Sequence, residues 1–319
     1  MGFFELVSEF LRNIDFEKSE IMQPQKLVFV CGGKASNKAD EPWSMRELLL
    51  QKAAQTVGSG KLGDATILLA EEAIKALEKS SFSNLLDLEE YIAAIVHAVL
   101  LIVESPGSMC ELGAFVKTQE IREKLIVIMP SDYKNVPSFI TSGAVKFLEE
   151  NYPPAQVLGF HWNVDKNGVI SAPDYTLDEM DIAIPEAMRQ VHKVHEKESF
   201  RKNKIGHLIY LCLAFCHLLR SAKLADIKEC FSVSGIVIDE TAVKRCIDTL
   251  VICKLLKAVE NGKLTYYVSR VGRMPLEIRW RSGTPNPDRN TLRRIARIAA
   301  EIEREEKFRI EMFRGHGNV

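Results

Sequence analysis

The first half of the chain alternates short apolar runs with segments whose apolar residues recur at helical spacing. Continuous runs rich in β-branched residues are typical of strands buried on both faces of a parallel sheet. The runs occupy residues 26–31, 66–69, 97–103 and 124–129. The helical patterns occupy residues 43–56, 71–79, 87–95 and 109–122. This alternation predicts an α/β fold with a doubly wound parallel sheet, on which ligands bind beyond the carboxyl ends of the strands.

The second half has a different order of elements. Residues 151–173 are irregular, and residues 176–204 indicate a charged helix that connects the two halves. Three helical patterns then precede two short strands around an Asn-Gly turn, which is a strong hairpin signal. These elements lie at residues 205–221, 224–231, 241–253, 255–259 and 264–268. Three helices followed by a hairpin predict an α+β winged helix-turn-helix domain.

These patterns divide the chain into five continuous parts. We expect an N-terminal helix, an α/β domain, a linker with a connector helix, the winged helix-turn-helix domain, and a basic C-terminal tail with a helix. In that order the parts are residues 1–25, 26–155, 156–204, 205–280 and 281–319.

The composition is that of a folded protein, since 46% of the residues are hydrophobic and 27% are charged. The longest apolar runs, 91–103 and 208–219, are shorter than the roughly 20 residues that cross a bilayer, so we expect no membrane span. The N-terminus carries acids where a secretory signal carries bases, so we expect a cytoplasmic protein. The seven cysteines include no C-x-x-C pair, so we expect neither a disulfide framework nor a metal site.

Charge is unevenly distributed along the chain. Residues 1–199 hold 19 Lys and Arg against 30 Asp and Glu, and residues 200–319 hold 23 against 13. The two halves therefore have net charges of −11 and +10. A basic half of this kind indicates binding to nucleic acid or another anion. The alternative is that the halves attract each other or a second copy of the chain.

Candidate nucleic-acid contacts lie on the third helix of the basic half, on its hairpin and on the arginines that follow. Helical spacing turns the bases of the third helix outward and Val243, Ile247 and Leu250 inward. The hairpin and the arginines would contact phosphates. The candidates are Lys244, Arg245, Lys263, Arg270, Arg273, Arg279, Arg281, Arg293 and Arg294. Because winged helices also bind proteins, a protein-interaction module is the alternative.

The most informative segment for chemistry is ESPGSMCELGAF at 104–115, where a strand gives way to a helix. Pro106 and Gly107 turn the chain. Ser108 is expected as the N-cap, and Glu111 then occupies the capping-box position, which gives it a structural role. The functional alternative is that the helix dipole favours the ionised form of Glu111, and that this carboxylate attacks an anomeric carbon.

Several motifs occur in an order that resembles the nucleoside 2-deoxyribosyltransferase family and, more narrowly, the effector proteins of retrons. They are FVCGG at 29–33, Trp43 and Arg46, Leu88-Glu89, ESPGS at 104–108 and ELGAF at 111–115. The resemblance covers roughly residues 26–150 in motif order. In retron effectors of this kind, a deoxyribosyltransferase-like domain is fused to a winged helix and acts beside a reverse transcriptase and its multicopy single-stranded DNA.

The resemblance implies a toxin of antiphage defence that acts as an N-glycosidase, with Glu111 as nucleophile and no cofactor. Glu104 stands where the transferases commonly have an aspartate that touches the base, a departure from ordinary deoxynucleoside substrates. Retron effectors imply NAD or a related nucleotide as substrate instead. They also imply that the reverse transcriptase and its DNA hold the toxin inactive, and the transferases imply a homo-oligomer.

The chemistry of NAD suits a single carboxylate. Nicotinamide joined to ribose is already cationic, so it leaves as a neutral base without a general acid. We expect the glycines to let backbone N–H groups approach phosphate or ribose, Arg46 to neutralise a phosphate, and Trp43 either to stack on a base or to pack in the core. The expected substrate-binding residues are Cys31, Gly32, Gly33, Trp43, Arg46, Glu71, Glu89, Ser105, Gly107 and Ser108.

Two other functions stay open. A housekeeping deoxyribosyltransferase with an appended domain would exchange free bases between deoxynucleosides. A DNA-binding winged-helix regulator would use its α/β domain only to sense a nucleotide, and it would not depend on the charge of Glu111.

Overall fold

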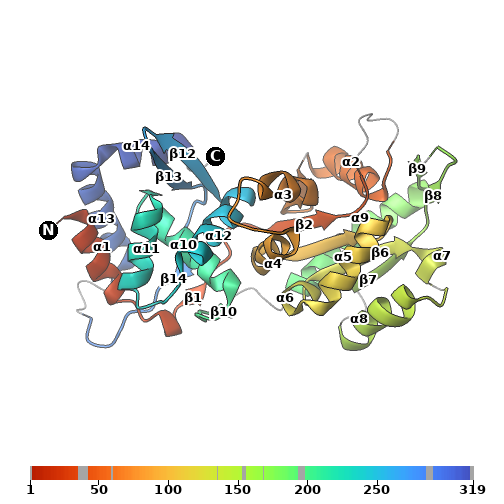
Figure 1. The fold of residues 1–319 in the computed structure, drawn as a ribbon, viewed down its shortest axis with the longest axis horizontal. Coiled ribbons are helices and arrows are strands. Elements are labelled where there is room, and N and C mark those ends of the chain that lie inside the picture. The colour runs from red at the N-terminus through yellow and green to blue at the C-terminus, as the bar shows by residue number, and fades with distance from the viewer. Residues whose placement is uncertain are drawn as a thin grey trace. The chain divides into compact units, whose positions relative to one another are not determined.

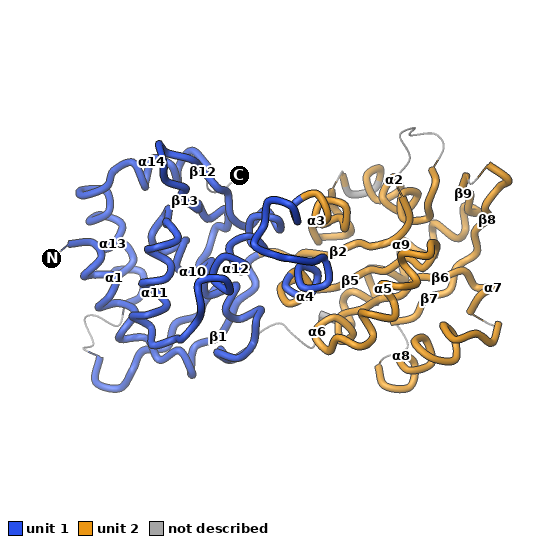
Figure 2. Tube along the Cα trace, viewed as in Figure 1, with its two compact units in different colours: residues 1–24, 76–91, 196–319 blue, residues 25–75, 92–195 orange. Residues whose placement is uncertain are grey.

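The chain forms two compact units, which are described separately (Figure 2). The computed structural model describes residues 2–34, 42–58, 60–134, 136–152, 156–167, 169–192, 198–284 and 290–316. Unit 1 contains residues 1–24, 76–91 and 196–319, and unit 2 contains residues 25–75 and 92–195. Both units are discontinuous in sequence, whereas the five expected parts are continuous. The expected boundary at residue 155 lies outside the described residues, and the five ranges stay a prediction.

Unit 2 is built on a six-stranded, mostly parallel sheet with the order β3-β4-β2-β5-β6-β7 (Figure 1). Only β3 runs antiparallel to its neighbour. The strands are β2 (Leu27–Cys31), β3 (Lys61–Leu62), β4 (Ala65–Leu69), β5 (Ala98–Ile102), β6 (Leu125–Pro130) and β7 (Val157–Phe160). The expected α/β class is confirmed.

Helices cover both faces of this sheet (Figure 1). On one face, Met45 and Leu49 of α2 and Ile184 of α9 share a core with Val28 and Leu100 of the strands. Helix α5 packs on the other face. The helices with residues in unit 2 are α2 (Met45–Val57), α3 (Ala70–Leu77), α4 (Leu85–Ile95), α5 (Pro106–Lys117), α6 (Gln119–Arg122), α7 (Ser131–Lys134), the π-helix η2 (Ile140–Val145), α8 (Lys146–Asn151) and α9 (Asp174–His192).

The segment expected to link the halves is instead part of unit 2. Strand β7 lies where an irregular stretch was expected, and it pairs with β6. Helix α9 ends at His192, and Met180, Ile184 and Ala187 are buried in the core. These apolar residues recur at helical spacing, so α9 is an amphipathic core helix rather than a solvated connector. A short hairpin precedes it, formed by β8 (Asn163–Val164) and β9 (Ile170–Ser171).

Unit 1 is assembled from residues near both ends of the sequence. A three-stranded antiparallel sheet has the order β10-β1-β14. Its strands are β1 (Glu20–Ile21), β10 (Glu198–Ser199) and β14 (Leu276–Glu277). Asp15 N–H donates to the carbonyl of Arg279 at 2.8 Å, and Phe10 packs edge to face on Trp280.

The remainder of unit 1 contains a helical group with a second small sheet, β11-β13-β12. The hairpin of β12 and β13 was expected, and its turn at Gly262 has a positive φ of 63° that favours glycine. The elements of this part of unit 1 are α10 (Ile205–Leu218), β11 (Ser221–Ala222), α11 (Leu224–Val233), α12 (Glu240–Ile252), β12 (Leu256–Asn261) and β13 (Leu264–Ser269). The terminal elements are α1 (Phe3–Arg12), the 3-10 turn η1 (Phe16–Lys18), α13 (Thr291–Glu305) and α14 (Lys307–His316).

A buried arginine attaches the last helix to the rest of unit 1. Arg309 is 1% exposed and its Nη1 donates to Asp226 at 2.8 Å and to the carbonyl of Ser221 at 2.6 Å. Its guanidinium also lies over the rings of Phe3 and Tyr266. Helix α14 is therefore an integral part of unit 1.

Of the helices in the described ranges, none combines the length and the apolar character needed to cross a membrane.

We expect Lys124→Met to destabilise unit 2 by about 2 kcal/mol, because it removes the donors for the carboxyl end of α4. Lys124 Nζ donates to the carbonyls of Ala93, Ala94 and Val96 at 3.0–3.2 Å, and its side chain is buried. Urea unfolding followed by circular dichroism measures the loss. The matched control is Lys117→Met at an exposed position of α5, and an equal loss in both variants would contradict the assignment.

Candidate active site

The candidate site lies where three neighbouring strands of unit 2 end. Counted in chain order, the parallel strands have the spatial order 2-1-3-4-5, so the direction of winding switches between β2 and β5. Ligands of doubly wound sheets bind at this switch point, beyond the carboxyl ends of the strands. Gly32 and Gly33 follow β2, Glu104 follows β5, and Glu71 follows the adjacent strand β4.

The carboxylate of Glu104 joins three chain segments through backbone hydrogen bonds. Its Oε1 accepts the N–H of Gly33 at 2.8 Å and that of Arg46 at 3.2 Å, and its Oε2 accepts the N–H of Met45. Because Met45 and Arg46 begin α2, the carboxylate lies at the positive end of that helix. Burial raises the pKa of Glu104, and the three N–H groups and the Arg46 charge oppose that rise. These contacts make Glu104 a positioning group, and its contact with a substrate base stays a prediction.

Gly32 and Gly33 leave the space that Glu104 occupies. A Cβ at residue 33 would lie 2.8 Å from Cβ of Ser44 and 3.0 Å from Oε1 of Glu104. At residue 32 it would lie 3.1 Å from that same oxygen. The 2.8 Å distance is closer than real Cβ contacts allow, so glycine is required at residue 33, whereas a Cβ at residue 32 would be tight.

Arg46 forms a bidentate ion pair with Glu71. Its side chain is 2% exposed, and its Nη1 lies 2.7 Å from Oε2 of Glu71 while Nη2 contacts the other oxygen. Planar pairs of this kind hold both side chains in one orientation. The terminal nitrogens of Arg46 are therefore occupied by a carboxylate of this chain, whereas we expected them to meet a phosphate.

Helix α5 begins three residues earlier than expected. Ser105 is its N-cap: the Ser105 hydroxyl accepts the N–H of Ser108 at 3.2 Å, and Ser108 Oγ accepts the N–H of Ser105 at 3.0 Å. Pro106 occupies the first helical position, where its fixed φ and missing N–H are tolerated. The expectation of Ser108 as N-cap is wrong. Glu111 is the sixth residue of the helix, so its capping-box explanation is also wrong.

Glu111 lies within electrostatic range of the Arg46–Glu71 pair. Burial raises the pKa of the Glu111 carboxyl group, Arg46 lowers it, and Glu71 raises it. Among the described residues, Oε2 of Glu111 is buried and has no hydrogen-bond donor, and Nε of Arg46 is buried and has no acceptor. This oxygen therefore has no hydrogen bond that would have to break before it acts as a nucleophile.

The other expected substrate-binding residues have diverse positions. Cys31 is buried at the end of β2, and Trp43 is 51% exposed before α2. Gly107 is the second residue of α5 and, like Ser105 and Ser108, belongs to its first turn. Glu89 is buried in α4, within the residues grouped with unit 1. In the part of the chain that the structure describes, no group of three or more His, Cys, Asp or Glu could hold a metal ion.

Several bases expected to bind nucleic acid are engaged within unit 1. Their partners are carboxylates and backbone carbonyls, so these side chains are oriented by the fold. The contacts are Lys244 with Glu240, Arg245 with Asp87, Arg273 with the Gln23 carbonyl, Arg279 with Glu277, Arg281 with the Ile14 carbonyl and Arg294 with Glu9. Lys263 and Arg293 are exposed and Arg270 is half-buried. Nucleic-acid binding by these nine residues stays a prediction.

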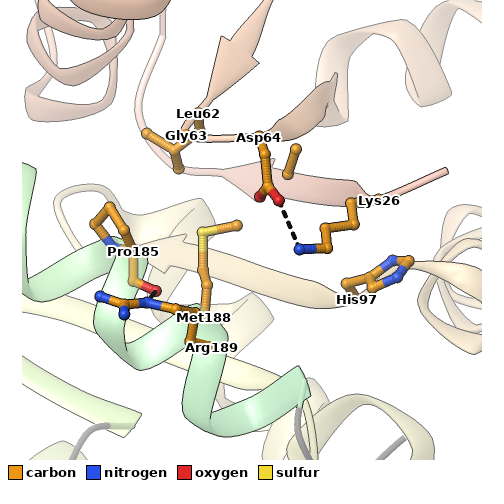
Figure 3. Close-up of a pocket in the computed structure, with 9 residues that line it drawn as sticks. Lys26, Leu62, Gly63, Asp64, His97, Pro185, Met188 and Arg189 are labelled. Atoms are coloured by element: carbon orange, nitrogen blue, oxygen red, sulfur yellow. Dashed lines mark hydrogen bonds and ion pairs between the residues drawn. The ribbon is translucent and has the colours of Figure 1, made fainter. Parts of the chain in front are cut away.

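A pocket of about 320 Å³ opens at the opposite edge of the sheet, where its strands begin (Figure 3). Lys26 precedes β2 and pairs with Asp64 at 2.6 Å, and His97 precedes β5. The lining residues are Lys26, Leu62, Gly63, Asp64, Ala65, His97, Pro185, Met188 and Arg189. Because the carboxyl edge is the ligand-binding edge of such sheets, we do not assign the candidate chemistry to this pocket.

Fold and site together define an α/β protein with a half-buried carboxylate within electrostatic range of an arginine–glutamate pair at the switch point of its sheet. A sequence profile of the STM3845 retron effector protein family matches residues 42–261, which is more than half of the chain. The chain belongs to this family of retron effectors.

Two curated proteins of Escherichia coli are similar to part of the chain. The "Retron Ec73 putative ribosyltransferase/DNA-binding protein" is 33% identical over 140 residues, which are 42% of this chain and 42% of that protein. The "Retron Ec86 putative ribosyltransferase/DNA-binding protein" is 36% identical over 124 residues, which are 39% of this chain and 37% of that protein. The chain thus spans about two fifths of the length of these relatives in the matched segments.

Replacing Gly33 by alanine should lower the free energy of unfolding by about 2 kcal/mol, since its Cβ would collide with Ser44 and displace Glu104. Thermal and urea unfolding measure this change. Gly113→Ala is the control, because a Cβ there meets nothing within 4 Å and α5 gains up to about 1 kcal/mol of helix propensity. Equal stabilities of the two variants would show that the close approach at residue 33 is unimportant.

Proposed function

We propose that this retron effector is a toxin that cleaves the N-glycosidic bond of NAD or a related nucleotide, with Glu111 as the nucleophile. The observation that carries the proposal is the environment of Glu111. Its buried oxygen has no donor among the described residues, it lies near the charge of Arg46, and α5 starts at the switch point of the sheet. The word ribosyltransferase in the names of both relatives supports glycosyl-transfer chemistry.

The proposed reaction has two steps at C1′ of the ribose. A Glu111 oxygen bonds to C1′ as the bond between C1′ and the nicotinamide nitrogen breaks. The electron pair of that bond returns to nicotinamide, which leaves neutral. Water then attacks C1′ and loses a proton to solvent, and Glu111 leaves as a carboxylate. The products are nicotinamide, ADP-ribose and a proton.

The two members of the Arg46–Glu71 pair act in opposite directions on the pKa of the nucleophile in this scheme. Burial alone disfavours an ionised carboxyl group, and the nearby guanidinium opposes that effect. Glu71 limits the attraction, so Glu111 is not held in a tight ion pair of its own. Within the pair, Arg46 thus opposes the rise in the pKa of Glu111 that burial causes, and Glu71 adds to it.

We further propose that unit 1 is a winged helix that binds nucleic acid and restrains the toxin. Its order of three helices and a hairpin supports this, as does the phrase DNA-binding in the names of the relatives. The partners would be the retron reverse transcriptase and its multicopy single-stranded DNA in the cytoplasm, and the enzyme would be a homo-oligomer. Release would deplete nucleotide in infected cells as an abortive antiphage defence.

Glu111→Gln should reduce release of nicotinamide from NAD at least about 1,000-fold, because the amide is a poor nucleophile of nearly unchanged size. Chromatography of reactions with NAD, NADP and deoxynucleosides, with and without the retron complex, measures the released base. The matched control is Glu150→Gln at an exposed position of α8. Base exchange between deoxynucleosides would instead identify a deoxyribosyltransferase, and full biological effect of the Glu111 variant would identify a nucleotide-sensing regulator.

Arg46→Gln should move the acid limb of the pH profile of kcat/KM to higher pH. Glu111 must be ionised to attack, so the rate falls as pH drops through its pKa. Removing Arg46 takes away the effect that lowers this pKa and leaves Glu71, which raises it. The double variant Arg46→Gln/Glu71→Gln removes both effects and should have its acid limb below that of the single variant. Coincident profiles of the parent and both variants would exclude this pair from control of Glu111.

A further inference from the structure

One side of α12 contacts a segment of unit 1 that is distant from it in sequence. Residues 76–91 belong to unit 1 although they lie between two stretches of unit 2 in the chain (Figure 2). Asp248 of α12 accepts two hydrogen bonds from Ser81, one from its N–H at 2.7 Å and one from its hydroxyl at 2.6 Å. We call residues 81–91 the latch.

Arg245 contacts the latch through an ion pair and through a cation–π contact. Its guanidinium lies over the ring of Phe82 at 5.3 Å, and its Nη2 lies 3.5 Å from Oδ2 of Asp87. Phe82 is 6% exposed and packs edge to face on Tyr91 at 5.0 Å. Arg245 is one of the two residues of α12 that the sequence predicts to contact nucleic acid.

The two contacts of Arg245, one with a carboxylate and one with an aromatic ring, resemble those that an arginine makes with the phosphate and the base of a nucleotide. Guanidinium groups recognise single strands by pairing with a phosphate and stacking on an unpaired base. In the latch, the Asp87 carboxylate takes the place of the phosphate and the Phe82 ring takes the place of the base. The carboxylate is a poor partner, because 3.5 Å is the outer limit of a hydrogen bond. In addition, Nε of Arg245 is buried and has no acceptor among the described residues.

The amino end of α12 favours a single strand over a duplex as the ligand. A recognition helix usually contacts the major groove with its first residues. Here those positions carry Asp239 and Glu240, and Glu240 is shared between Lys228 and Lys244. Because two acids offset the two lysines, this end has no net positive charge to attract the two phosphate backbones that border a major groove. Arg245 lies farther along the helix, where one phosphate and one base can reach it.

We propose that the latch occupies Arg245 as a nucleotide would, and that single-stranded DNA binds α12 only when it displaces the latch. The stronger bidentate contact of a phosphate with Arg245 replaces the weak contact of Asp87. The same displacement releases Ser81 from Asp248. Nucleic-acid binding by unit 1 is thereby coupled to the release of residues 81–91. The proposal rests on the proposed binding of nucleic acid by unit 1. The contacts that it breaks, those of Ser81, Phe82 and Asp87 with α12, include no residue of the Glu104, Arg46, Glu71 and Glu111 site.

The first test opens the latch by Ser81→Ala/Asp87→Asn in the full chain. Fluorescence anisotropy with a fluorescein-labelled oligothymidine of about 20 nucleotides measures Kd. We expect affinity to rise about tenfold, and we expect Arg245→Gln in the same background to abolish the gain. Asp178→Asn, at a position 72% exposed on α9, is the control for the loss of one negative charge. An unchanged Kd, a gain that persists without Arg245, or an equal gain in the control overturns the proposal.

A second test uses the unaltered protein, so it does not depend on the folding of a variant. Hydrogen exchange is measured with and without saturating oligothymidine. Exchange of the amides of residues 81–91 should accelerate when the DNA is bound. Unchanged protection of these amides in the DNA-bound protein, or tighter binding of a duplex of the same length, rejects the displacement of the latch by a single strand.

Discussion

The carboxylate of Glu104 is the contact on which the geometry of unit 2 at the switch point depends. It gathers N–H groups from the end of β2 and the start of α2 around a residue that follows β5. A buried carboxylate needs such donors, since an uncompensated one is strongly disfavoured. Because one donor is the N–H of Arg46, the same contact sets where the Arg46 side chain starts, and hence its pairing with Glu71. The charges near Glu111 therefore depend on the hydrogen bond between Glu104 and the backbone N–H of Arg46, and on the pairing of Arg46 with Glu71.

The α/β class could be predicted because its signal is local. Residues 27–31 and 98–103 are apolar at consecutive positions, which is typical of strands covered on both faces. The loops after these strands could be singled out for the same reason, since ligand sites lie at strand ends. The start of α5 could have been predicted although Ser105 and Ser108 are both good N-caps, because the sequence carries a signal that separates them. Only the fit of Pro106 to the first helical position distinguishes them.

Contacts between residues that are distant in sequence could not be predicted from the pattern of apolar and polar positions. Nothing in the spacing of Arg46 and Glu71 indicates their ion pair, because it joins residues of two different strand–helix connections. Strand β7 has only four residues and α9 has many charges, so the sequence pattern predicts a linker for both. The two-residue strands β1 and β14 carry too few residues to show a period. Their register follows from packing that only the folded unit provides.

The composition of unit 1 from residues 1–24, 76–91 and 196–319 bears on how the protein is made. Synthesis proceeds from the N-terminus at about 5–20 residues per second, and compact regions fold as they emerge. Residues 25–195 leave the ribosome before most of unit 1 exists, whereas Asp15 must wait for Arg279 to form its backbone hydrogen bond. The carboxylate site is thus complete in the nascent chain before the unit that contains α12. A ribosome that stalls between these two stages would carry a chain that has the site but lacks that unit.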